Sequence, residues 1–156
     1  MISRRLAALL SPFVVGLPVG LTILDVFGYV AKVDGVSMQP SLNPDGKTGD
    51  FVFLSRWAVR DFRVARGEIV SLVSPKDPGT KIIKRVIGVE GDIIQTLKWK
   101  RHFLRVPPGH IWIEGDHKLH SLDSNTFGPV CGILLLLGAG FTWSGDKQSN
   151  THRLAP

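Results

Sequence analysis

The sequence predicts a mainly β domain, a sandwich or a barrel, joined to one N-terminal helix. Seventeen glycines and ten prolines are spread along the 156 residues, which indicates many turns and short strands. From Lys32 onward, short β-branched runs alternate with turn residues, and no segment carries a convincing apolar stripe at the helical period. An apolar segment without charges precedes this pattern and supplies the helix.

The N-terminal segment has the length and composition of a membrane anchor. No residue is charged from Leu6 to Leu24, and a helix of that length rises roughly 28 Å, about the hydrocarbon thickness of a bilayer. Arg4 and Arg5 precede it, so the positive-inside rule puts residue 1 on the cytoplasm-like side and the rest of the chain across the membrane. We therefore predict a segment 1–31 with a transmembrane helix at about residues 6–24. A cleaved targeting segment and a buried core helix are the alternatives.

The β-rich domain is predicted to cover residues 32–143, followed by a polar tail at residues 144–156. Apolar Val130–Gly140 is too short to span a bilayer, so a buried strand pair is expected there. Turn residues delimit six further predicted strands. These are Phe51–Arg56, Glu68–Ser74, Lys81–Val89, Asp92–Leu97, Phe103–Val106 and His110–Glu114.

Composition excludes several classes of function. The single cysteine, Cys131, leaves no internal disulfide and no multi-cysteine metal site. Only His117 and His120 lie close together, in a segment without a helical pattern, so neither a metal nor a cofactor is predicted. The net charge of +6 comes from scattered residues, which disfavours nucleic acid and, beside an apolar N-terminus, favours a lipid bilayer.

Ser37 and Lys84 are the candidate chemical groups. Ser37 follows Gly35, which allows close backbone approach, and it lies about a dozen residues past the predicted anchor. In a strand, Lys84 shares a face with two β-branched residues, which makes it a candidate for a desolvated amine. Burial lowers the pKa of a lysine towards working pH, where the neutral amine acts as a base. A turn serine and a solvent-facing lysine are the alternative interpretations.

A third polar cluster spans Gly115–Asn125. It has the composition of an ordinary polar loop, and it also offers His120 and Asp123 as partners of Ser37 in a Ser-His-Asp triad. The spacing excludes neither possibility.

These segments together resemble the signal peptidase I family. The nucleophile motif of that family is present at Gly35–Leu42, the lysine motif at Lys84–Asp92 and the third motif at Gly115–Ser124. Arg66–Val70 matches the strand motif between the first two, and the likeness extends from about Lys32 to Val130. The resemblance implies a signal-peptidase-type β-sandwich or barrel domain with one N-terminal transmembrane helix. It also implies a peptidase without metal or cofactor.

The resemblance implies a Ser/Lys dyad, in which Ser37 attacks the scissile carbonyl and Lys84 takes its proton. Ser121 would then hydrogen-bond the lysine amine, and Arg85 would form a structural ion pair with Asp116. Asp123 would order the loop, and Met38 would pack beside the nucleophile. Extended substrate would pair with strand edges at Asp34, Gly35, Val36, Ile82 and Ile83.

The chain departs from the family pattern at three places. The backbone N–H of Ser37 would donate to the oxyanion, but many relatives have a second serine where this chain has Gly35. The arginine that ends the third motif is replaced by Asn125. The likeness to the family stops after Val130. Whether the chain has the strand that closes the domain in the family is therefore left open.

Within the family, the likeness is strongest to the mitochondrial inner membrane proteases. This implies a single-pass protein of that membrane, with its catalytic domain in the intermembrane space and a homologous partner subunit. Its substrates would be precursor polypeptides carrying sorting presequences. Two alternatives remain open. One is a catalytically impaired subunit that stabilises its partner, and the other is a self-cleaving repressor domain, which needs an N-terminal DNA-binding motif that the sequence lacks.

Overall fold

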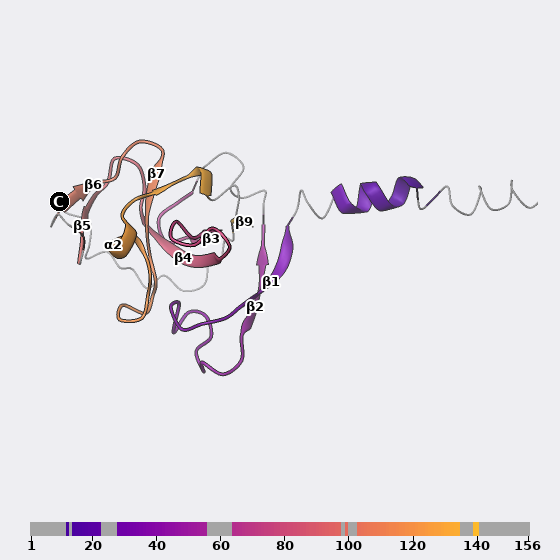
Figure 1. The fold of residues 1–156 in the computed structure, drawn as a ribbon, viewed down its shortest axis with the longest axis horizontal. Helices are drawn as coiled ribbons and strands as arrows, with labels where there is room; N and C mark the ends of the chain where they lie inside the picture. The colour runs from indigo at the N-terminus through magenta and orange to yellow at the C-terminus, as the bar shows by residue number, and fades with distance from the viewer. Residues whose placement is uncertain are drawn as a thin grey trace, which may run out of the picture.

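The computed structural model describes residues 12, 14–22, 28–55, 64–97, 99, 103–134 and 139–140. Figure 1 shows the strands gathered into one body, with a helical segment at residues 14–22 standing apart from it. The regular elements of this body are β1 (Tyr29–Val33), β2 (Asp50–Leu54), β3 (Ile69–Val73), β4 (Lys81–Gly88), β5 (Ile93–Gln95), β6 (Phe103–Arg105), β7 (His110–Glu114), α2 (Ser124–Phe127), β8 (Val130–Cys131) and β9 (Ala139–Gly140).

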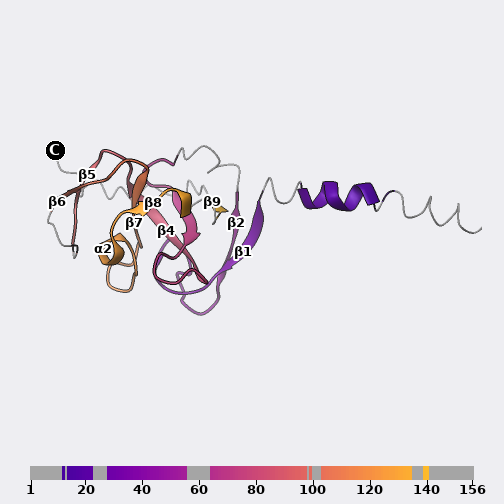
Figure 2. The ribbon, with the colours of Figure 1, turned by 45° about the horizontal axis from the view of Figure 1, so that its top comes forward.

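The strands form three antiparallel sheets. The largest has five strands in the order β8-β7-β4-β3-β9, and β1-β2 and β5-β6 form two-stranded sheets beside it. Figure 2 shows β1 and β2 at the side of the body from which the N-terminal helix leaves. The mainly β prediction is confirmed. Among the described residues the strands do not close into a single barrel.

Three hydrophobic clusters fill the space between the sheets. The first joins β1 and β2 to the turn after β1, through Val33, Leu54 and Met38. The second lies along the five-stranded sheet, and the third packs β5 and β6 against Trp112 of β7. Most of β3 is buried, because this strand lies inside the five-stranded sheet. A continuous apolar run is typical of a strand in that position.

Each predicted strand overlaps an observed strand, with ends that differ by at most two residues, and one strand, β1, was not predicted. β1 begins at Tyr29, so it crosses the predicted boundary at residue 32. Its start is set by Gly28, whose φ of 134° suits glycine and whose Cα lies against the backbone of Leu54. Within the predicted strand Phe51–Arg56, residues 51–54 belong to β2, Ser55 follows this strand, and Arg56 lies outside the described residues.

The apolar C-terminal segment does not form the expected strand pair. β8 pairs with β7 and β9 pairs with β3, so the two short strands occupy opposite edges of the five-stranded sheet. Burial is also uneven, because Val130 is buried while Ile133 is 58% exposed. The predicted tail at residues 144–156 lies outside the described residues.

The predicted transmembrane segment is only partly described. Residues 14–22 are helical, and their apolar side chains, such as Val14 and Leu17, are exposed. Within the described part of the chain, no helix combines the length and the apolar character needed to cross a membrane. Residues 6–11, 13, 23 and 24 of the predicted span lie outside the described residues.

Candidate active site

Ser37 lies in a tight turn that follows β1. The N–H of Gln39 donates to the carbonyl of Val36 at 3.1 Å, and the N–H of Leu42 donates to that of Met38 at 2.9 Å. Met38 and Leu42 are buried in the first hydrophobic cluster. These two apolar side chains thus anchor the turn in the cluster, while Ser37 stays partly exposed to solvent.

Lys84 reaches this serine from the middle of β4. Its side chain is buried, with the residue only 4% exposed. The Lys84 amine donates a 2.7 Å hydrogen bond to the Ser37 hydroxyl and a 3.0 Å bond to the carbonyl of Ile83. Two groups that are 47 positions apart in the sequence are therefore in direct contact.

Burial changes the chemistry of this amine. It lowers the pKa of Lys84 from 10.5 to about 8, although the negative charges of Asp123 and Asp116 act in the opposite direction. With a pKa near 8, roughly a tenth of the amines are neutral at pH 7. A neutral amine next to a hydroxyl can accept its proton.

Arg85 points away from Lys84 and connects three parts of the site. It binds Asp116 through two hydrogen bonds of 2.8 and 2.7 Å, and both side chains are largely buried. The guanidinium also donates to the carbonyl of Gly67 and to the hydroxyl of Ser41. The ion pair that the family resemblance implied is thus formed, and it joins β4 to the nucleophile turn and to the third polar segment.

The segment after β7 packs directly against Ser37. The N–H of His117 donates to the carbonyl of Ser37 at 3.1 Å. A side chain at Gly115 would collide with that same carbonyl and with the Ser121 hydroxyl. Glycine is therefore required at position 115 by close approach, and the segment helps to fix the backbone of Ser37.

Asp123 orders this segment from within. Its carboxylate accepts from the N–H of Asn125, which caps α2, and from the N–H of Gly115 at 3.1 Å. The side-chain amide of Asn125 donates to Glu114 at 3.0 Å and to Asp123 at 3.3 Å. An amide thus connects the two carboxylates at the position where the family has arginine. Four-residue α2 was missed because the sequence was interpreted as a polar loop.

Ser121 does not make the contact that the resemblance implied. Its hydroxyl oxygen is buried and has no hydrogen-bond partner among the described residues. The Lys84 amine donates instead to Ser37 and to the carbonyl of Ile83. The expected bond between Ser121 and Lys84 is therefore absent in this conformation.

The triad alternative is not formed either. His120 is exposed, its backbone N–H donates to the ring of His117, and the two rings meet edge to face with centroids 4.8 Å apart. Across the described residues no hydrogen bond links His120 to Ser37, and the hydroxyl accepts from Lys84 instead. Asp123 caps α2 rather than orienting an imidazole.

A cleft of about 430 Å³ opens beside Ser37 and Lys84. Asp34, Gly35, Ile82 and Ile83 all line it, whereas predicted Val36 lies outside the lining and is 40% exposed. Further lining residues that the sequence did not indicate include Tyr29 and Lys81, whose amine donates to the Tyr29 hydroxyl at 2.9 Å.

Two strand edges face this cleft without a partner in the described structure. β1 pairs only with β2, so its other edge is open. The first half of β4 pairs with β3 on one side, while β7 begins to pair with the opposite side only at Arg85. Ile82 and Ile83 therefore have an open edge, which provides room for an added strand.

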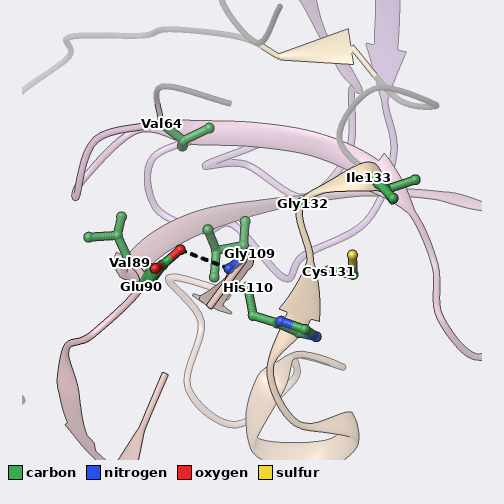
Figure 3. Close-up of a pocket in the computed structure, with 9 residues that line it drawn as sticks. Val64, Val89, Glu90, Gly109, His110, Cys131, Gly132 and Ile133 are labelled. Carbon is green, nitrogen blue, oxygen red and sulfur yellow. Dashed lines mark hydrogen bonds between the residues drawn. The ribbon is translucent and has the colours of Figure 1, made fainter. Parts of the chain in front are cut away.

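A second cleft of about 390 Å³ lies elsewhere, around Val64, Val89 and Cys131 (Figure 3). In it the carboxylate of Glu90 accepts a 2.8 Å hydrogen bond from the N–H of Gly109. It contains neither Ser37 nor Lys84. Within the described residues, no group of three or more potential ligands is arranged to hold a metal ion.

Comparisons with known proteins identify the family to which the chain belongs. Residues 6–100 match the family described as signal peptidase, peptidase S26. The chain is similar to the mitochondrial inner membrane protease subunit 2 of Danio rerio, at 60% identity over 81% of this chain and 70% of that protein. It is also similar to the mitochondrial inner membrane protease subunit 1 of Homo sapiens, at 42% identity over 66% of this chain and 61% of that protein.

Among solved structures, a signal peptidase I from Enterococcus faecalis aligns with 52% of this chain and 97% of its own, at 19% identity and a TM-score of 0.43. The family match and the similarity to subunit 2 decide the class: the chain belongs to the signal peptidase family, peptidase S26. The names of the relatives support a protease function and associate it with the mitochondrial inner membrane.

Proposed function

We propose that the chain is a membrane-anchored serine endopeptidase that removes sorting or signal presequences from precursor proteins delivered to the mitochondrial intermembrane space. The observation that carries this proposal is the 2.7 Å contact between the Lys84 amine and the Ser37 hydroxyl. It is supported by the burial of Lys84, whose pKa of about 8 makes the neutral amine accessible at physiological pH.

The proposed reaction uses these two side chains in sequence. The neutral Lys84 amine takes the proton of Ser37 while the hydroxyl oxygen bonds to the scissile carbonyl carbon. The developing oxyanion accepts from the backbone N–H of Ser37. Lys84 then returns the proton to the leaving amine, and an acyl-enzyme remains. A water molecule, deprotonated by Lys84, releases the acyl group and restores Ser37.

The substrate is proposed to bind as an extended strand in the cleft. Its backbone would pair with the open edges at Asp34–Val36 and Ile82–Ile83, since edge strands offer unpaired N–H and C=O groups. The side chains beside the cleaved bond would be small, such as alanine or serine.

The proposed location follows from the relatives and from the N-terminus. The names of the relatives place them at the mitochondrial inner membrane. The absence of charge from Leu6 to Leu24 supports a single-pass anchor, with the catalytic domain in the intermembrane space. Inner membrane protease subunit 1 is the proposed partner, with which the chain would form a hetero-oligomer. The proposed anchor would lie in the lipid bilayer.

The anchor is tested by alkaline carbonate extraction of membranes that contain the protein. We expect the full chain to stay in the membrane pellet. Release into the soluble fraction would exclude a spanning helix without touching the catalytic proposal.

A second candidate function is a catalytically impaired subunit that stabilises a homologous partner. One observation favours it: among the described residues, the Ser121 hydroxyl makes no hydrogen bond to Lys84. Cleavage of a precursor in reconstituted membranes separates the two functions. Wild type and Ser37→Ala are each assayed with and without subunit 1. If Ser37 is the nucleophile, Ser37→Ala abolishes the cleavage due to this chain, whereas an impaired subunit gives equal cleavage in both cases.

A further inference from the structure

Asn43 is a buried polar residue next to the nucleophile turn. It is only 3% exposed, and its φ of 53° is the only positive value among the described residues that are not glycine. Asparagine tolerates this conformation better than most side chains. A buried amide in a left-handed conformation suggests a specific task, because it needs hydrogen-bond partners for both ends of its side chain.

Those partners lie on both sides of the loop that joins the nucleophile turn to β2. The amide oxygen of Asn43 accepts from the N–H of Asp50 at 2.5 Å, while the N–H of Asn43 donates to the Asp50 carboxylate at 2.6 Å. These two hydrogen bonds hold the loop against Asp50, the first residue of β2. Asn43 is therefore fixed to a strand that is itself anchored in the first hydrophobic cluster.

The remaining end of the side chain binds the backbone that leads to Ser37. The amide nitrogen of Asn43 donates to the carbonyl of Val33 at 2.7 Å and to the carbonyl of Gly35 at 3.0 Å. Val33 is the last residue of β1, and Gly35 is two positions before the nucleophile. A single amide thus holds both ends of the segment that contributes Asp34 and Gly35 to the cleft.

The direction of these two bonds decides which backbone groups face the cleft. The C=O and the N–H of one trans peptide point in opposite directions. Since Asn43 is bound to β2, the Val33 carbonyl points to the β2 side. The N–H of Asp34, which belongs to the same peptide, then points away from β2, toward the open edge that lines the cleft.

We infer that Asn43 is a positioning residue that fixes the Val33–Gly35 backbone so that Asp34 presents its N–H to an extended substrate. The inference rests on the proposed function, because it assigns Asn43 to the same cleft. Within the described structure, no hydrogen bond joins Asn43 to Ser37 or Lys84, so its proposed contribution is to substrate pairing rather than to proton transfer.

Two probes separate pairing from chemistry in the purified full chain, reconstituted with lipid and subunit 1. One is an internally quenched peptide with alanine before the cleaved bond, which needs the strand edge. The other is p-nitrophenyl acetate, a small activated ester that acylates the serine without pairing. Asn43→Gly keeps the left-handed conformation but removes the amide. We expect its KM for the peptide to rise about tenfold, the effect of losing one or two positioned hydrogen bonds. Its kcat, the rate with the ester and the pH midpoint should not change.

Matched variants decide the interpretation. Asn43→Asp keeps a side chain of the same size but places a carboxylate next to the carbonyls of Val33 and Gly35. We therefore expect it to raise KM as Asn43→Gly does. It is the variant to use if Asn43→Gly does not fold. Gln39→Ala removes a bond to the carbonyl of Asn43 and leaves the amide contacts intact, so its KM should match wild type. An unchanged KM in a folded Asn43 variant, or an equal loss with both probes, would overturn the inference. Failure of the proposed function looks different, because Ser37→Ala would then keep wild-type rates with both probes.

Discussion

The two halves of the candidate site are held in different ways. Ser37 and Lys84 belong to a turn and a strand whose neighbours are buried in the hydrophobic clusters, and their side chains contact each other directly. Segment 115–123, in contrast, is held to them mainly by polar contacts, such as those of His117 and Asp116. Its Ser121 hydroxyl is buried without a hydrogen-bond partner among the described residues.

This difference indicates that the two halves have different tasks. Apolar packing holds Ser37 and Lys84 in contact without a hydrogen bond from Ser121 among the described residues. The polar segment supplies the Asp116 and Asp123 charges, which oppose the effect of burial on the pKa of Lys84. The cleavage rate is thus expected to depend strongly on Ser37 and Lys84. Stability is expected to depend on specific hydrogen bonds in and beside segment 115–123, the polar segment.

Replacement of Lys84, the proposed base, should give the largest effect. We expect Lys84→Arg to lower kcat for peptide cleavage by about 10²–10⁴-fold, because a guanidinium keeps its proton at working pH. The measurement is steady-state cleavage of the quenched peptide. The control is His120→Ala, which should retain substantial activity because His120 is exposed and bonded to His117. A His120 variant that is folded but inactive would mean that His120, and not Lys84, acts as the base.

The pH dependence of cleavage should identify the base. The proposed reaction needs the neutral form of Lys84, so kcat/KM should rise about tenfold per pH unit below the pKa and level off above about 8. A midpoint near 6.5, the ordinary value of histidine, would contradict a lysine base. The rate of acylation by p-nitrophenyl acetate provides the same midpoint without a contribution from peptide binding.

Removal of the buried charge should stabilise the fold at neutral pH. The pKa of Lys84 is about 8 in the folded chain and 10.5 in the unfolded reference, so the unfolded chain binds more protons between these values. The cost of burying the amine is therefore complete below pH 8 and disappears as the pH rises to 10.5. We expect Lys84→Met to raise the free energy of unfolding by up to about 3 kcal/mol at pH 7. Denaturant titrations at pH 7 and pH 10 measure this gain, and an equal gain at both would contradict the linkage.

Ser124, the first residue of α2, and Ser121 of the polar segment should differ in their effect on stability. Ser124 is fully buried and its hydroxyl accepts from the N–H of Ile113 at 3.0 Å, so Ser124→Ala should cost about 1–3 kcal/mol. Ser121→Ala removes a hydroxyl that has no partner in the described structure, and its free energy of unfolding should stay equal or rise slightly. Thermal or denaturant unfolding compares the two variants. A larger loss for Ser121→Ala would mean that its hydroxyl is bonded in solution.

The sequence by itself determined the fold class and the candidate reactive groups. Glycines and prolines at turns predicted short strands. The alternation of side chains between the two faces of a strand placed Lys84 on one face with Ile82 and Val86. These signals are local, because they depend on residues a few positions apart. The same local signals did not indicate Asn43, since one asparagine before a proline is typical of any turn.

Only the tertiary structure decided how these groups meet. The contact between Ser37 and Lys84 depends on how β4 packs beside the turn after β1, and the lowered pKa depends on how completely the neighbours exclude water. The opposite positions of β8 and β9 depend on which sheet edges were free. Sequence separation carries no distance between such segments, so a buried amine, an open strand edge and an unbonded Ser121 hydroxyl become visible only once the chain is folded.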